Sequence, residues 1–231
     1  MSEPIVQVLH SGKTHDQKLN RWPDECPICL QGCEPKRWGH EHFIYGADTS
    51  QLEVVFQCPR FKCRRLFIAL YGPIDDQLGG LTKKYYLRGY IPRSSKPAIF
   101  GKQITEASAS FAEIYNQALV AEGNNLHHIC GPGYRKALEF LIKAFLITVQ
   151  NVPKKTIESK YLGPCIADHL SGTDVAKCAT RAAWLGNDET HFVRKWTDKD
   201  LADLKILIEL TVRCIETDML KAQYKQEMPA K

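Results

Sequence analysis

The spacing of apolar residues changes near residue 100, and this change divides the chain into two predicted regions. Between residues 37 and 92, β-branched and aromatic residues form short runs that end at glycine or proline, as strands do. We predict strands at Phe43–Tyr45, Leu52–Cys58, Arg64–Tyr71 and Lys83–Pro92, with a turn at Gly79-Gly80. Residues 1–25 show no clear period, so we expect an irregular arm there.

From residue 104 onward, apolar residues recur every three or four positions, which predicts amphipathic helices. Gly186 is predicted to end the fourth of them because glycine tolerates positive φ, and Thr197 and Asp200 are predicted to form the capping box of the last. The predicted helices are Ile104 to near Gly123, Tyr134–Val149 ending before Pro153, Ile157–Leu170 with an interruption at Gly163-Pro164, Asp174–Leu185 with Thr173 as N-cap, and a long last helix that carries Leu201 to Met219. The predicted fold class is α+β, with a β module over residues 1–97 and an all-α bundle over residues 98–231.

Length and composition favour an ordinary globular protein. The chain has 231 residues, of which 44% are hydrophobic and 25% charged. No apolar run approaches the ~20 residues that span a bilayer. The first residues lack the basic and apolar regions of a secretory signal. We therefore expect a cytoplasmic protein with no membrane partner.

Two pairs of cysteines predict a metal site in the β module. The chain has nine cysteines, and an odd number without a secretory signal argues against a disulfide framework. Structural Zn²⁺ takes four thiolate or imidazole ligands in a tetrahedron. The motifs C-P-I-C and C-P-R-F-K-C supply the four predicted ligands, Cys26, Cys29, Cys58 and Cys63. We predict a small zinc-ribbon module whose structural zinc adds folding energy to a small core.

Alternatives to this ligand set stay open. Cys33, His40 or His42 lies close enough in sequence to replace one of the four thiolates. An iron–sulfur centre and four free thiols are two further interpretations of the same pattern. Four protein ligands leave no coordination position for water or substrate, so the predicted metal is structural rather than catalytic.

The net charge of +5 is concentrated in one segment. Residues 58–96 contain nine lysines or arginines against two aspartates, interleaved with aromatic residues. Cations neutralise phosphates and aromatic faces stack on exposed bases, so the segment is a candidate surface for RNA or DNA. The candidate residues are Arg60, Lys62, Arg64, Arg65, Lys83, Lys84 and Arg88. Alternation along strands explains the pattern equally well if the aromatics face inward and the charges face solvent.

The stretch A-A-W-L-G-N-D-E-T-H, residues 182–191, is the candidate catalytic segment. A histidine acts as a general acid or base near neutral pH, and an arginine stabilises phosphate charge during RNA cleavage by the 2′-hydroxyl. The candidate residues are Asn187 and His191, with Arg181 six residues before Asn187. The alternative is an ordinary helix-ending turn.

This segment, together with G-P-G-Y-R-K-A-L-E-F-L-I-K and T-D-K-D-L, resembles the bacterial family named domain of unknown function 4145. The resemblance implies a HEPN-like helical bundle, an N-terminal pair of zinc knuckles matched by the paired cysteines, and dimers formed through the bundle. In HEPN ribonucleases, four to six intervening residues separate the arginine from the histidine. Those positions are 184–186 here, and none is arginine. The charge would have to come from Arg181, from Arg194 one turn after the histidine, or from Arg135 with Lys136 on another helix.

The leading functional hypothesis is a zinc-binding bacterial or phage protein that binds nucleic acid or a protein partner. Its biological setting, implied by the resemblance, is a restriction, phage-defence or toxin-like system. One alternative is a metal-independent HEPN-type endoribonuclease that uses His191. A second alternative is a scaffold or adaptor without catalysis.

Overall fold

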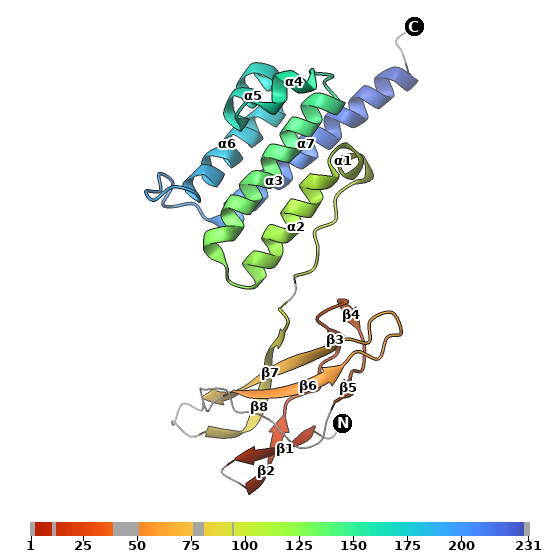
Figure 1. Cartoon of the computed structure of the whole chain (residues 1–231), viewed down its shortest axis with the longest axis vertical. Helices are drawn as coiled ribbons and strands as arrows, with labels where there is room; N and C mark the ends of the chain where they lie inside the picture. Colours follow the sequence, from red (N-terminus) through yellow and green to blue (C-terminus); the bar gives the residue numbers. More distant parts are fainter. Residues whose placement is uncertain (1–2, 11–12, 39–50, 76–80, 94, 229–231) are drawn as a thin grey trace. The chain divides into compact units, whose positions relative to one another are not determined.

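The computed structural model describes residues 3–10, 13–38, 51–75, 81–93 and 95–228. The chain divides into two compact units, Met1–Lys96 and Pro97–Lys231 (Figure 1). The first unit, here called the β unit, is built from strands, and the second, the helical unit, is built from helices. The predicted α+β class is therefore confirmed.

A six-stranded sheet with the order β1-β2-β8-β7-β6-β5 organises the β unit. Neighbouring strands are antiparallel, except that β2 pairs in parallel with β8. A separate two-stranded ribbon pairs β3 with β4. The strands are β1 (Ile5–His10), β2 (Lys13–Leu19), β3 (Glu25–Cys26), β4 (Gln31–Gly32), β5 (Lys36–Arg37), β6 (Leu52–Gln57), β7 (Leu66–Asp75) and β8 (Leu81–Ile91).

The prediction of an irregular arm over residues 1–25 is wrong. Its residues form the hairpin β1–β2, and β2 extends the sheet by pairing Lys18 with Lys84 and Leu19 with Tyr85. Val6 and Leu19 are completely buried in the core of the β unit. The strand-like character of this segment therefore comes from a partner far along the chain, which a local period does not reveal.

The predicted strands at residues 52–58 and 83–92 are confirmed within a residue or two by β6 and β8. The third strand continues past its predicted end at Tyr71 to Asp75, with a register irregularity between Pro73 and Asp75. Arg88 supports this extension by donating a hydrogen bond to the Pro73 carbonyl at 2.9 Å. The predicted strand Phe43–Tyr45 and the turn at Gly79-Gly80 lie outside the described residues.

The helical unit packs its helices around one apolar core. Its largest completely buried side chains include Tyr134, Phe111 and Ile142, and Phe145 is 2% exposed. The helices are α1 (Lys102–Ala107), α2 (Ala109–Gly123), α3 (His127–Thr148), α4 (Lys154–Glu158), α5 (Leu162–Leu170), α6 (Asp174–Asp188) and α7 (Leu201–Glu227). No helix in the described part of the chain is long and apolar enough to cross a membrane.

Several helix ends differ from the predictions. The first predicted helix is split at Ser108, whose side chain accepts a hydrogen bond from the Phe111 N–H and starts α2. The second begins seven residues before Tyr134, and the break in the third precedes Gly163 instead of falling on it. Thr173 caps α6 as predicted, whereas the capping box of α7 joins Asp200 to Asp203 and leaves Thr197 out.

Gly186 does not end its helix, which continues to Asp188. It is buried where α6 approaches α3, and a Cβ at this position would lie 2.8 Å from Cβ of Arg135 and 2.9 Å from its Cγ. Glycine is therefore needed here for helix packing rather than for a positive φ.

A half-buried polar triad joins three helices of the bundle. The Glu122 carboxylate accepts hydrogen bonds from the Tyr134 hydroxyl at 2.6 Å and from Lys205 Nζ at 2.7 and 3.0 Å. Burial favours a higher pKa for Glu122, but the bonds from Lys205 and Tyr134 outweigh it and lower the pKa below its usual value. Glu122 therefore stays ionised and ties α2 to α3 and α7.

The start of the helical unit is fixed by one side-chain amide. Asn116 accepts a hydrogen bond from the Ala98 N–H at 2.7 Å and donates one to the Ala98 carbonyl at 3.2 Å. Both backbone groups of Ala98 are thus satisfied as they would be in a strand pair. Phe100 then packs against Phe111 and Tyr115, which anchors the segment before α1.

Candidate metal centre and polar surfaces

Two tight turns, here called the first and second knuckles, present the paired cysteines. In the first knuckle, residues 26–30, the Leu30 N–H donates to the Cys26 carbonyl at 2.8 Å. Leu30 directly follows Cys29 and has a φ of 55°, which turns the chain back into β4. The backbone N–H groups of Ile28 and Cys29 donate toward the Cys26 sulfur.

The second knuckle, residues 58–65, repeats this geometry between β6 and β7. The N–H groups of Cys63 and Arg64 donate to the Arg60 carbonyl at 2.9 and 3.1 Å. Arg64 directly follows Cys63 and has a φ of 54°. Cys58 directly follows β6, and its N–H donates to the Arg65 carbonyl at 3.0 Å, so the turn is closed at Arg60, two residues later. This offset explains the longer spacing between the second pair of cysteines.

The two knuckles bring the four predicted ligands together. The Sγ atoms of Cys26, Cys29, Cys58 and Cys63 all lie within 4.8 Å of one another. The Cys26–Cys63 and Cys29–Cys58 sulfur pairs are each 3.9 Å apart, far longer than a disulfide bond. A tetrahedral Zn²⁺ with bonds of ~2.3 Å requires sulfurs ~3.8 Å apart. The cluster therefore has the composition and size of a four-thiolate metal site.

The pKa values of three thiols in this cluster are shifted in different directions from the usual value of a cysteine. Burial raises the pKa of Cys26 to about 12 and that of Cys58 to about 11. Burial also acts to raise the pKa of Cys63, but hydrogen bonds from the Arg65 N–H and from neighbouring sulfurs outweigh it and lower the value. Because Cys26 and Cys58 are protonated near neutral pH in the metal-free fold, binding of a metal ion has to displace their protons.

Cys33 lies beside the cluster but not within it. Its sulfur interacts with Cys58, and burial raises its pKa. The four-sulfur group is complete without Cys33. His40 and His42, the other alternative ligands, lie outside the described residues.

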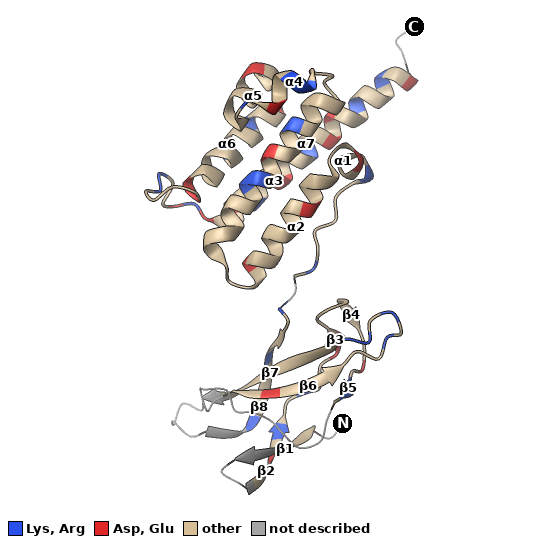
Figure 2. Cartoon of the chain, viewed as in Figure 1, with Lys and Arg blue, Asp and Glu red and all other residues tan. Residues whose placement is uncertain are grey.

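The predicted basic segment is separated by the fold into two groups. Arg60, Lys62, Arg64 and Arg65 all lie exposed on the second knuckle, and Figure 2 shows the resulting blue loop between β6 and β7. None of these four cations forms an ion pair with a carboxylate of the described residues.

The remaining basic candidates lie on β8, and two of them, Lys84 and Arg88, interact with other groups of the β unit. Lys84 pairs with Glu3 and lies over the Tyr86 ring at 5.5 Å, and the Arg88 guanidinium bonds to Pro73. The side chain of Lys83 is outside the described residues. The second knuckle is therefore where the unpaired positive charge of the described β unit collects.

The aromatic residues of the same segment also fall into two groups, rings buried in the β core and a ring exposed at the second knuckle. Phe67, Tyr71 and Tyr85 are buried in the β core, as the alternative interpretation of the sequence required. Phe61 is different, since 87% of its surface is exposed at the second knuckle. One aromatic residue of the segment is thus presented together with four cations.

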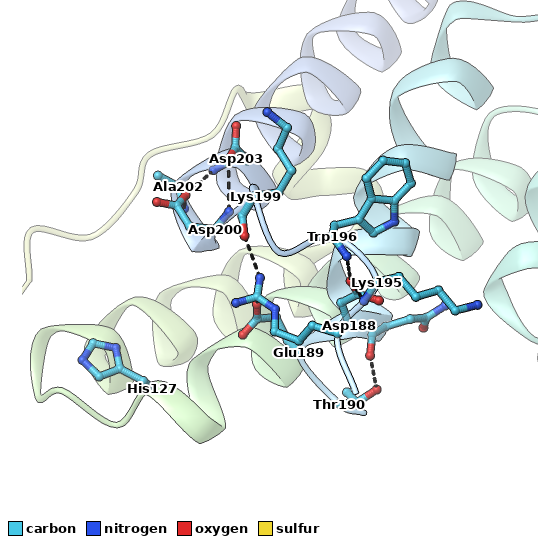
Figure 3. Close-up of polar contacts among 12 residues, drawn as sticks. His127, Asp188, Glu189, Thr190, Lys195, Trp196, Lys199, Asp200, Ala202 and Asp203 are labelled. Carbon is cyan, nitrogen blue, oxygen red and sulfur yellow. Dashed lines mark hydrogen bonds and ion pairs between the residues drawn. The ribbon is translucent and has the colours of Figure 1, made fainter. Parts of the chain in front are cut away.

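In the helical unit, Asp188 is a buried hydrogen-bond acceptor within the polar stretch that follows Gly186. Asp188 is 5% exposed, and its carboxylate accepts hydrogen bonds from the N–H groups of Lys195 at 2.8 Å and Trp196 at 2.6 Å (Figure 3). Trp196 in turn stacks on Trp184 at 6.1 Å between ring centres. Asp188 therefore holds the loop between α6 and α7, a role that its spacing in the sequence does not indicate.

The candidate catalytic residues are only partly assembled. Arg135 Nε donates to Asn187 Oδ1 at 2.6 Å, so the arginine that meets Asn187 comes from α3. Arg181 bonds instead to the carbonyl of Lys177, one turn earlier on α6. His191 is exposed in the loop, and its N–H donates to the Asp188 carbonyl at 3.4 Å.

Glu139 modifies the charge at this position. Its carboxylate lies 3.5 Å from Arg135 and 2.8 Å from Lys143, all along one face of α3. Arg135 is therefore partly neutralised where it meets Asn187.

Comparisons with protein-family models, curated proteins and solved structures gave no match to this chain.

Proposed function

We propose that the β unit is a zinc-ribbon module in which a structural Zn²⁺ holds the second knuckle as a nucleic-acid-binding surface. The observation that carries this proposal is that one turn of the four-sulfur cluster presents an exposed aromatic ring and four exposed cations, none of them paired with a carboxylate within the described part of the chain. Cations at this density attract phosphates, and the ring offers a stacking face. The metal has no open position and serves to fix the turn.

We further propose that the helical unit is a HEPN-like bundle of the family named domain of unknown function 4145. Two segments that carry the resemblance lie on α3 and at the end of α6, which pack against each other at Gly186 and Arg135, and the third leads into α7. The implied setting is a bacterial or phage conflict system in which the chain recognises RNA or DNA. A homodimer formed through the bundle belongs to the same proposal.

Replacing Arg64 and Arg65 by glutamate is expected to weaken binding to a labelled oligonucleotide by at least about 10-fold near 0.1 M salt. The reason is the loss of two phosphate-neutralising charges and the gain of two repulsive ones. Fluorescence anisotropy over a salt series measures the effect, and the slope of log K against log salt should fall by ~1.4 to 1.8.

The matched control replaces Lys154 and Lys155, both exposed on α4, by glutamate. This changes the net charge by the same amount while leaving the knuckle intact. Equal loss of affinity in the two variants would show that only overall charge matters, which contradicts a site at the second knuckle.

A second candidate function is a metal-independent endoribonuclease. The contact between Arg135 and Asn187 favours it, because it brings an arginine from α3 to the helix that leads into the loop of His191. The expected result is cleavage of RNA in the presence of EDTA, lost in His191→Ala and in Arg135→Ala and kept in Arg181→Ala. Unchanged far-UV circular dichroism controls for folding. Cleavage that survives His191→Ala would exclude this candidate.

A further inference from the structure

Phe61 is the most exposed large apolar side chain in the described β unit. Its 87% exposure compares with 56% for Trp38 and 48% for Leu66. Exposing a phenylalanine to this degree gives up the free energy of burial that its neighbour Phe67, 2% exposed, obtains in the core. Folding of the β unit therefore does not account for an aromatic residue at this position.

The knuckle presents Phe61 on a constrained backbone. Cys58 and Cys63 flank it, and both lie in the four-sulfur cluster. Between them the Arg60 carbonyl accepts two backbone hydrogen bonds, which close the turn around Phe61 and Lys62. An aromatic side chain with two rotatable bonds on such a turn loses little conformational freedom when a ligand covers it.

Positive charge surrounds the ring along the chain. Arg60 and Lys62 are its immediate neighbours, and Arg64 and Arg65 follow on the far side of Cys63. The ligand that matches a flat apolar face between cations is a base with phosphates on both sides.

Stacking on Phe61 requires a base whose face is free. In a duplex, both faces of each internal base are covered by neighbouring base pairs, whereas a single strand can offer an unstacked base at little cost. We propose that the second knuckle binds single-stranded RNA or DNA, with one base stacked on Phe61. This inference rests on the proposed nucleic-acid-binding function and names its substrate class and its stacking residue.

The test compares Phe61→Ala and Phe61→Trp in the full, metal-loaded chain. Anisotropy is measured with a short labelled oligothymidine and with the same strand in a duplex. Phe61→Ala is expected to weaken single-strand binding about 5- to 100-fold and duplex binding less than about 2-fold, and Phe61→Trp is expected to retain binding. Phe192→Ala, which removes a fully exposed phenylalanine of the helical unit, is the matched control and should change neither.

Each other outcome overturns a defined part of the proposal. Unchanged single-strand affinity in Phe61→Ala, with metal content equal to wild type, excludes stacking while leaving the basic knuckle as a binding surface. A selective loss of duplex binding shows that Phe61 wedges into a groove and overturns the single-strand assignment. Failure of the wild-type chain to bind either probe overturns the proposed function itself.

Discussion

Replacing Cys58 by serine is expected to remove the metal and to unfold the β unit while the helical unit keeps its structure. Cys58 is completely buried and belongs to both the four-sulfur cluster and the apolar core of the β unit. Structural zinc contributes roughly 10–16 kcal/mol of apparent binding free energy at neutral pH. A hydroxyl is a far weaker ligand than a thiolate, and the small β core has little other stability to offset the loss.

Metal analysis and hydrogen exchange measure this result. The wild-type chain should carry about one zinc per molecule and the variant much less. Amide protection should vanish in β6, β7 and β8 and persist in α3 and α7. Cys33→Ser is the matched control, since Cys33 neighbours the cluster without belonging to it. Full metal content in Cys58→Ser would refute the four-thiolate site, as would its loss in Cys33→Ser alone.

Replacing Gly186 by alanine is expected to destabilise the helical unit by about 1–3 kcal/mol, although alanine is the better helix former. The added Cβ would lie 2.8 Å from Cβ of Arg135, a position close to the backbone of α3. The neighbouring helices would have to separate, and the bond between Arg135 and Asn187 would lengthen. Urea unfolding followed by far-UV circular dichroism reports the change.

Gly163→Ala, in the same unit, is expected to raise stability where Gly186→Ala lowers it. Gly163 lies in the first turn of α5, and an added Cβ there has no atom within 4 Å. Reduced freedom of the unfolded chain should then stabilise the unit by about 0.5–1 kcal/mol. If both substitutions changed stability in the same direction, close packing would not be the reason for glycine at 186.

The four-sulfur cluster could be predicted from the sequence because its geometry is local. Each pair of cysteines lies within one turn, and few backbone conformations bring two such pairs to one point. The hairpin β1–β2 could not be predicted in this way, since the strand that pairs with Leu19 lies at Tyr85. Its formation depends on a contact across most of the β unit, which leaves no periodic pattern.

The polar stretch near residue 190 illustrates a different limit. Its residue types suggest chemistry, yet Asp188 supports a loop and Gly186 permits helix packing. Burial decides these roles, and burial depends on α3 and on the loop that returns toward α7. Phe61 shows the converse case. It shares its sequence context with the buried Phe67, and only their measured exposure separates a ring in the core from a ring at the surface.

The clamp of Asn116 on Ala98 sets the length of the tether between the units. Strand β8 ends at Ile91 and the clamp begins at Ala98, so only the six residues 92–97 of the sequence separate these two points. If both units bind one nucleic-acid strand, a connection this short would raise the local concentration of the strand at the second unit to roughly the millimolar range. Weak affinity in each unit would thus combine into tight capture of a single long molecule.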